Sequence, residues 1–241
     1  MTTRTNEFNQ PIGEEVPQWQ AREKPQRIVL TGQYCQLVPV SHDQHLDDLY
    51  EAYTSAPDGR DWTYLFQAPP SDKTTFSQYL KNVETSQDPL AYTVIDLASQ
   101  KAVGTLSLMR IDPTHGVIEV GGVTFSPKLK QTPLSTEAQF LLMQYAFDHL
   151  GYRRYEWKCD SLNAPSRKAA LRLGFQFEGI FRQAIVYKGR SRDTAWFSII
   201  DSEWPTVKAA LAAWLAHANF DENGQQKQRL EAIRQSIASH T

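Results

Sequence analysis

The segment KLKQTPLSTEA, residues 128–138, places basic and hydroxyl side chains directly before a long apolar helical pattern. The start of a helix has unpaired backbone N–H groups and the positive end of the helix dipole, so it is suited to binding phosphate. Ser135 and Thr136 can cap the helix, whereas Pro133 removes one N–H group and no glycine lies in the turn. Taken alone, the segment fits an ordinary capped helix start better than a phosphate site.

A second helix start, in NAPSRKAALRLGF, also follows a strand pattern, and its first two turns carry Arg167, Lys168 and Arg172. Cations near a helix N-terminus oppose the helix dipole, which costs stability unless an anion compensates. A solvated basic face is the alternative interpretation. Two helix starts thus bear cations, and each follows a strand. Their joint occurrence favours a single elongated polyphosphate ligand over two unrelated basic segments.

The elements that must position these residues can be read from periodicity and turn signals. Residues 1–30 contain three prolines and no clear period, which predicts an extended arm that wraps the surface with Trp19 as its anchor. A strand at 34–40 precedes two helices, the first capped by Ser41. Three further strands, at 90–97, 101–111 and 116–125, predict an antiparallel meander.

The second half alternates helices and strands. A long helix has an apolar stripe from Leu134 to Tyr145 and ends at Gly151, and a strand at 153–160 precedes a short helix capped by Asn163 and stopped by Gly174. A hairpin at 175–200 turns at Lys188 and Gly189, and helices at 201–218 and 222–240 follow. This order predicts an α+β fold, with a mixed sheet covered by helices on both faces.

Composition excludes several other classes of protein. The formal charge is -2 and the pI is near 6.3, which gives no general attraction to nucleic acid or to anionic membranes. Cys35 and Cys159 predict two buried, reduced thiols, and neither they nor His42 and His45 form a metal-binding pattern. Since no targeting signal or membrane-spanning stretch is evident, we expect a cytoplasmic protein without a metal, a membrane or a nucleic-acid partner.

Several motifs together resemble the GNAT superfamily of acyl-CoA N-acetyltransferases, and within it the Rim-type branch that acetylates the N-termini of ribosomal proteins. The resemblance covers roughly residues 33–202 and lies in TEA, LGYRRYEWKCDSLNAPSRKAALRLGF, FEGIFR and GRSRDTAWFSII. It implies a splayed, mostly antiparallel GNAT sheet and three regions: an arm at 1–30, an acetyltransferase domain at 31–202 and a helical extension at 203–241.

The resemblance also implies acetyl-CoA as co-substrate. Its pyrophosphate would lie on the loop before the TEA helix, its pantetheine arm on the preceding strand, and its adenosine phosphates near the second helix start. The residues implied are Lys130, Gln131, Thr132, Leu134, Ser135 and Thr136 for the loop, Val123, Thr124 and Phe125 for the strand, and Asn163, Ser166, Arg167, Lys168 and Arg172 for the second helix. The glycine position of the family loop is Pro133 here, which predicts a reduced affinity for the co-substrate.

Acetyl transfer to an amine requires a neutral nucleophile, a polarised carbonyl and a proton donor for the leaving thiolate. Glu119 is the candidate base, directly or through water, with an exposed strand carboxylate as the alternative. The family's tyrosine acid falls on Ala170, so Ser166 is the remaining hydroxyl candidate.

The loop between the first two predicted helices of the chain borders the acceptor site in this family. It supplies Asp61, Trp62 and Tyr64, and we expect Trp62 to pack in any case. The late hairpin carries three arginines that could meet an acidic acceptor or simply be solvated: Arg182, Arg190 and Arg192.

We therefore predict an N-acetyltransferase that moves an acetyl group from acetyl-CoA to an amine, with a protein or peptide N-terminus as the expected acceptor. A small amine, such as a polyamine, amino acid or aminoglycoside, is the alternative acceptor. A non-catalytic acyl-CoA-binding module is a rival, motivated by Pro133 and Ala170, and nucleic-acid binding is a third option that the charge disfavours. The arm and the terminal helices could cover a sheet edge or form a homodimer contact.

Overall fold

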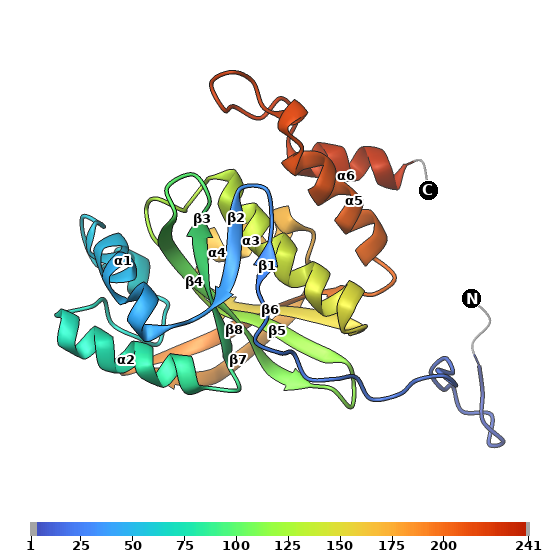
Figure 1. The fold of residues 1–241 in the computed structure, drawn as a ribbon. Coiled ribbons are helices and arrows are strands. Elements are labelled where there is room, and N and C mark those ends of the chain that lie inside the picture. The colour runs from blue at the N-terminus through green and yellow to red at the C-terminus, as the bar shows by residue number, and fades with distance from the viewer. Residues whose placement is uncertain (1–3, 240–241) are drawn as a thin grey trace.

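A computed structural model of the chain describes residues 4–239 and contains an eight-stranded sheet (Figure 1). The strand order is β1-β2-β3-β4-β5-β6-β8-β7. All neighbouring strands are antiparallel except β5 and β6, which run parallel. The strands are β1 (Leu30–Thr31), β2 (Cys35–Pro39), β3 (Leu90–Asp96), β4 (Lys101–Asp112), β5 (Val117–Phe125), β6 (Arg154–Asp160), β7 (Gln176–Tyr187) and β8 (Arg190–Ile200).

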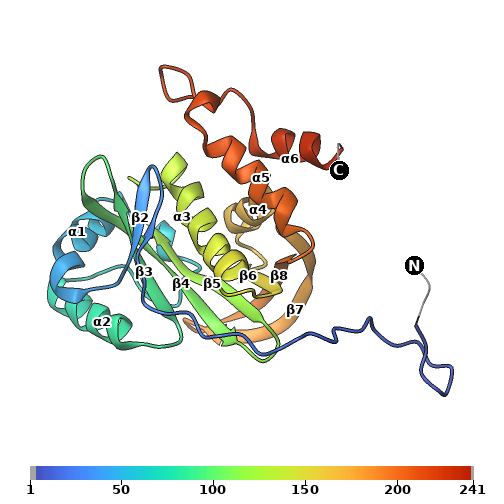
Figure 2. The same ribbon diagram turned by 45° about the vertical axis from the view of Figure 1, so that its right-hand side comes forward.

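Helices cover both faces of this sheet, as Figures 1 and 2 show. On one face lie α1 and α2, and on the other lie α3, α4 and α5, with α6 packed on α4 and α5. Each face has its own hydrophobic cluster, because successive strand residues point to opposite sides: Ala91 belongs to one cluster and Tyr92 to the other. The helices are α1 (His42–Thr54), α2 (Lys73–Thr85), α3 (Pro133–Gln144), α4 (Ala164–Leu173), α5 (Trp204–Leu215) and α6 (Leu230–Ala238).

The predicted fold class is confirmed, and the predicted elements occur in the predicted order, but β1 was not predicted and several boundaries differ. The long helix continues beyond α3 as a π-helical segment, Tyr145–His149, and it ends before Gly151 at a φ of 68°, as expected. The last helix begins at Leu230 rather than at residue 222. In the segment before Leu230, the Asp221 carboxylate accepts the backbone N–H groups of Asn223 and Gln225, and these bonds hold the turn out of helical geometry. The predictions for residues 1–3 and 240–241 lie outside the described residues.

Helix capping differs in part from expectation. Ser41 occupies the N-cap of α1 but its hydroxyl makes no capping hydrogen bond; its N–H instead donates to Nδ1 of His45, at 3.0 Å. The cap of α3 is Thr132, whose Oγ1 accepts the N–H of Ser135, so Ser135 and Thr136 are not caps. Pro133 is the first residue of α3, a position that tolerates proline because its N–H would have no helical partner.

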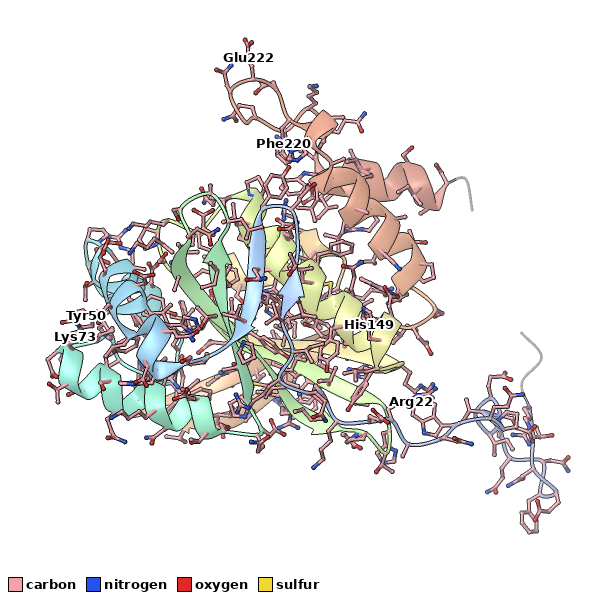
Figure 3. All side chains as sticks on the ribbon, in the orientation of Figure 1. Arg22, Tyr50, Lys73, His149, Phe220 and Glu222 are labelled. Carbon is pink, nitrogen blue, oxygen red and sulfur yellow. The ribbon has the colours of Figure 1, made fainter. Side chains whose placement is uncertain are left out.

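The N-terminal arm is attached to the body at Trp19 and at Arg22, and Figure 3 labels Arg22. Trp19 Nε1 donates to the carbonyl of Thr114 at 2.9 Å, and Arg22 Nε donates to the carbonyl of Gly151 at 2.9 Å. The anchoring role of Trp19 is thus confirmed. Before Trp19, however, the described chain projects away from the body instead of wrapping it (Figures 1 and 2).

Glu137 fixes α3 to the edge of the sheet. Its side chain is buried, and its two carboxylate oxygens accept the backbone N–H groups of Gln33, Tyr34 and Cys35 at 2.7–2.8 Å. A Cβ atom at Gly32 would lie 2.3 Å from Cδ of Glu137, so only glycine leaves room for this contact. The TEA motif therefore has a structural role, because its glutamate holds the start of α3 against the turn between β1 and β2.

Candidate active site

The two central strands separate part-way along their length. β5 and β6 pair only from Val117 to Val120, opposite Arg154 to Trp157, although β5 runs on to Phe125 and β6 to Asp160. Their facing edges beyond this point have no sheet partner. A bulge at Gly122, whose φ is 58°, bends β5 here. The result is an open wedge in the middle of the sheet.

A cavity of about 570 Å³ occupies this wedge and brings most of the predicted site residues together. The predicted residues that line it are Asp61, Trp62, Tyr64, Glu119, Val123, Thr124, Phe125, Lys130, Gln131, Ser135, Thr136, Asn163, Ser166 and Arg172. Four others do not line it: Thr132, Leu134, Arg167 and Lys168. The side chain of Thr132 caps α3, and that of Leu134 packs against the core.

The start of α3 presents free backbone donors. Within residues 4–239, the N–H groups of Gln131, Thr132 and Leu134 have no hydrogen-bond acceptor. Gln131 adopts a φ of 60°, which turns the chain sharply into the helix without a glycine. Three unpaired N–H groups at the positive end of a helix dipole form a site suited to a diphosphate.

The cations of α4 are distributed differently from the prediction. The helix has only ten residues, so Arg172 lies in its last turn, where a cation favours the dipole. Arg172 Nη1 donates to Thr136 Oγ1 at 3.1 Å, which links the end of α4 to the first turn of α3. Arg167 donates to the carbonyl of Ser161, and with Lys168 it faces a separate groove beside α5 and α6. The prediction that Arg172 opposes the helix dipole at the start of α4 is therefore wrong.

Glu119 lies at the point where the strands separate, and only 5 % of its surface is exposed. The alternative interpretation from sequence, that Glu119 is an exposed strand carboxylate, is therefore wrong. Its Oε2 is 2.8 Å from Nζ of Lys158 and 3.3 Å from Nε of Arg110. Burial raises the pKa of Glu119 above its ordinary value, and Lys158 and Arg110 oppose this rise. The carboxylate is therefore desolvated but still compensated by cations.

Ser166 and Asn163 lie on the opposite side of the wedge, at the start of α4. Asn163 Oδ1 accepts the N–H of Ser166 at 3.2 Å, which confirms the predicted cap. The hydroxyl of Ser166 accepts a hydrogen bond from Trp157 Nε1 at 3.0 Å and keeps its own proton to donate. Ala170, at the position of the family tyrosine, is fully buried, so no hydroxyl acid is supplied from there.

The loop between α1 and α2, residues 55–72, closes the cavity and is tied down at several points. Asp61 forms an ion pair with Lys130, and the Tyr64 hydroxyl donates to the carbonyl of Leu162 at 3.2 Å. Lys188 and Arg190, from the β7–β8 turn, donate to the carbonyls of Trp62 and Thr63, each at 2.7 Å. The Trp62 ring packs edge-on against Tyr53 at 5.4 Å between centroids, as expected. The loop is thus a fixed wall of the cavity.

Comparison with known proteins places this geometry in a family. Residues 36–176 match the family described as an acetyltransferase (GNAT) domain. The chain belongs to the GNAT acetyltransferase family. Its similarity extends to a solved structure of a GCN5-related N-acetyltransferase from Brucella melitensis, with 50 % identity, a TM-score of 0.90, and coverage of 91 % of this chain and 100 % of the other. The fold predicted from the motifs is therefore confirmed.

Two curated relatives are more distant. The ribosomal-protein-serine acetyltransferase of Escherichia coli is 27 % identical over 166 residues, which cover 67 % of this GNAT chain and 90 % of the relative. An uncharacterized N-acetyltransferase, p20 of Bacillus licheniformis, is 30 % identical over 113 residues. That alignment spans 47 % of this chain and 63 % of the relative, so it covers less than two thirds of that protein.

Two polar residues of this GNAT cavity were missed from sequence, and for a third, Arg192, the sequence left two interpretations open. Lys158 carries a side chain that is 7 % exposed, and Gln139 is 2 % exposed with no hydrogen-bond partner for its amide nitrogen or oxygen. Arg192 is 7 % exposed, whereas the hairpin arginines were considered only as possible contacts or solvated residues. Alternation along β6 signals that Glu156 and Lys158 share a face, but only the β5–β6 register brings Glu119 to them.

The remaining polar candidates do not form a metal site. Among residues 4–239, no three His, Cys, Asp or Glu side chains are grouped to hold a metal ion. His42 contacts Asp43 and Ser77, while His45 is buried against Thr93, so the two rings have different partners. Cys35 and Cys159 are free and buried, as predicted. No helix within the described part of the chain is long and apolar enough to span a bilayer.

Proposed function

We propose that this GNAT protein transfers an acetyl group from acetyl-CoA to the amine of a protein or peptide N-terminus, as a member of the Rim-type branch. One observation carries the proposal: a single cavity is lined by Gln131, whose N–H at the start of α3 is free, by the unpaired edges of β5 and β6, and by the Glu119 carboxylate, and the free N–H groups of Thr132 and Leu134 follow Gln131 in the chain. The relative from Escherichia coli is named for a ribosomal-protein serine, which supports a protein acceptor.

The residues of the cavity fit acetyl-CoA, whose thioester supplies the acyl group when it is bound. The N–H groups of Gln131, Thr132 and Leu134 donate hydrogen bonds to the diphosphate oxygens, and the positive end of the α3 dipole favours the negative charge of the diphosphate. The unpaired edge of β5 from Val123 to Phe125 offers backbone groups to the amides of the pantetheine arm. Lys130, held by Asp61, adds positive charge beside the loop.

Glu119 and Ser166 act on opposite sides of the wedge, the first as a base and the second as a hydrogen-bond donor. Glu119 accepts a proton from the acceptor ammonium, directly or through water, and so leaves a neutral amine. As the new C–N bond forms and the C–S bond breaks, the amine loses a second proton to solvent, and the Ser166 hydroxyl, oriented by Trp157, donates a hydrogen bond to the leaving thiolate, which then takes a proton from water. Backbone N–H groups along the open edge of β5 stabilise the developing negative charge on the carbonyl oxygen.

A coupled assay tests the proposal. Purified protein is incubated with acetyl-CoA and peptides, free thiol is measured, and mass spectrometry locates the acetyl group. A peptide with a free α-amine should be acetylated there, whereas the same peptide with a blocked α-amine and a free lysine should not react. Faster turnover with polyamines, amino acids or aminoglycosides would replace the proposed acceptor by a small amine. Tight acetyl-CoA binding by calorimetry without any turnover would favour the non-catalytic module.

A further inference from the structure

Arg192 is a buried cation with an incomplete set of partners. It lies on β8, is 7 % exposed, and lines the cavity. Its Nε donates to Thr194 Oγ1 at 3.1 Å, but within residues 4–239 neither Nη atom has a hydrogen-bond acceptor and no carboxylate forms an ion pair with it. The aromatic rings of Phe66 and Tyr187 flank it, with centroids 5.7 Å and 6.0 Å from Cζ.

Among residues 4–239, no carboxylate forms an ion pair with this guanidinium. The neighbouring carboxylate, Asp160, already accepts the Tyr187 hydroxyl at 2.8 Å and the N–H of Leu162 at 2.9 Å. The adjacent Lys188 and Arg190 add further positive charge. Removing a guanidinium from water is costly unless an anion compensates it, so this end of the cavity is suited to a bound carboxylate.

The position of Arg192 along β8 sets the distance of that carboxylate from the reacting amine. Trp196 lies opposite Lys158, whose Nζ is 3.8 Å from the Trp196 ring centroid, and strand alternation puts Arg192 on the same face. Arg192 and Trp196 are four positions apart, which is about 13 Å of strand. The guanidinium of Arg192 is directed along β8 toward Thr194, which shortens this distance. A carboxylate bound to it would therefore lie on the order of 10 Å from Glu119 and Lys158, which is the length of roughly three residues of extended peptide.

We propose that Arg192 binds an acidic side chain of the acceptor, so that the preferred acceptor is a peptide with Asp or Glu at its second or third residue. The two free Nη groups match the two oxygens of a carboxylate in a bidentate pair. A free amino acid fits less well, because its carboxylate lies next to its amine. This inference rests on the proposed acetyl transfer to a peptide and specifies its substrate class.

Matched peptides test the inference. In two series, Glu is replaced by Gln at the second or the third residue, and kcat/KM is measured for the wild type, Arg192→Gln and Arg192→Lys. The wild type should prefer the Glu peptide of one series by about ten- to a hundredfold, as expected for hydrogen bonds to charged groups. Arg192→Gln should abolish this preference, and Arg192→Lys should retain part of it. The KM for acetyl-CoA and the melting temperature should change little in either variant.

Arg182→Gln is the matched control, since Arg182 is an exposed arginine of the same hairpin that does not line the cavity. It should keep the wild-type preference. Peptide acetylation without discrimination between Glu and Gln would support the proposed function and overturn the role of Arg192. A preference that survives in Arg192→Gln would also overturn it.

The same experiment separates failure of the inference from failure of the proposed function. If no peptide is acetylated, calorimetry of the Glu and Gln peptides with the wild type and Arg192→Gln decides whether Arg192 recognises a carboxylate. Small amines with a carboxylate, such as free glutamate, form a further arm. Faster turnover of these amines than of any peptide would overturn the peptide acceptor.

Discussion

The Nζ of Lys158 lies 2.8 Å from Oε2 of Glu119, at the end of the short stretch where β5 and β6 are paired. The same ammonium is 2.6 Å from Oε2 of Glu156, so one cation lies between two carboxylates that are largely removed from water. Burial raises the pKa of Glu119, and the Lys158 ammonium opposes that rise. Lys158 therefore favours the ionised form of Glu119, which its proposed role as a base requires.

Replacing Glu119 by Gln should lower kcat by about 10²- to 10⁴-fold, because a general base contributes that much to proton transfer. Burial raises the pKa of Glu119 above its ordinary value of 4.5, so the acid limb of the wild-type profile of kcat/KM against pH should lie above pH 4.5. This limb should disappear in Glu119→Gln. A variant that keeps both the rate and the acid limb would exclude Glu119 as the base.

The raised pKa of Glu119 also has a predictable effect on stability. Between pH 4.5 and its folded-state pKa, the folded protein binds more protons than the unfolded chain, so the free energy of unfolding falls as pH rises through this window. Glu119→Gln should lack this decrease, whereas Glu51→Gln, which changes an exposed carboxylate, should retain it. Urea unfolding at a series of pH values measures the difference, and equal slopes in all three proteins would contradict it.

Replacing Lys158 by Met should move the acid limb of kcat/KM to higher pH, because Glu119 loses the nearer of its two compensating cations. Unfolding in urea should show a loss of about 3–5 kcal/mol, the usual cost of removing one partner from a buried ion pair. Lys101→Met breaks an exposed pair with Asp48 and should cost under about 1 kcal/mol. An unchanged acid limb in Lys158→Met would show that Lys158 does not control the protonation of Glu119.

Replacing Gln139 by Leu should have opposite effects on stability and on binding. The Gln139 amide is buried without a partner, so its removal should stabilise the free protein by about 1–3 kcal/mol. Because the side chain lines the cavity, we expect it to bond to the pantetheine arm, and its loss should weaken acetyl-CoA binding about tenfold. Urea unfolding and calorimetry measure the two effects. A destabilised variant with unchanged affinity would assign Gln139 to the core instead.

Replacing Glu137 by Ala should lower the free energy of unfolding by about 3–5 kcal/mol, since three backbone N–H groups lose a charged acceptor in a buried place. The matched control is Glu51→Ala, which removes an exposed carboxylate paired with Lys128 and should cost at most about 1 kcal/mol. Similar midpoints for the two variants in urea would contradict the structural role of the TEA motif.

Local signals in the sequence predicted most of the fold. Gly151 and Gly174 stop their helices with φ values of 68° and 110°, and Lys188 with Gly189 forms the hairpin turn with φ values of 49° and 69°. Such positions are fixed by backbone conformation alone, which a single residue type reveals. The loop after α5 was mistaken for helix because its polar side chains bond to nearby backbone, an alternative that composition does not show.

The site was predicted less completely because its polar contacts depend on register and burial. The position of Lys158 beside Glu119 requires the parallel pairing of β5 with β6, and a shift of one residue would turn either side chain to the other face. Arg172 was placed near the start of α4, although the predicted stop at Gly174 already puts it in the last turn. The burial of Arg192 depends on the loop that packs over it, which lies more than a hundred residues earlier in the chain.

The central claim is that the backbone N–H groups at the start of α3 bind the diphosphate of acetyl-CoA, although proline occupies the glycine position of the family. Amide resonances of uniformly ¹⁵N-labelled protein, followed during titration with acetyl-CoA and separately with pantetheine, test it most directly. We predict that acetyl-CoA produces the largest shifts at Gln131, Thr132 and Leu134, and that pantetheine, which lacks the diphosphate, does not shift them. Saturable binding of acetyl-CoA that leaves these three amides unchanged would contradict the account.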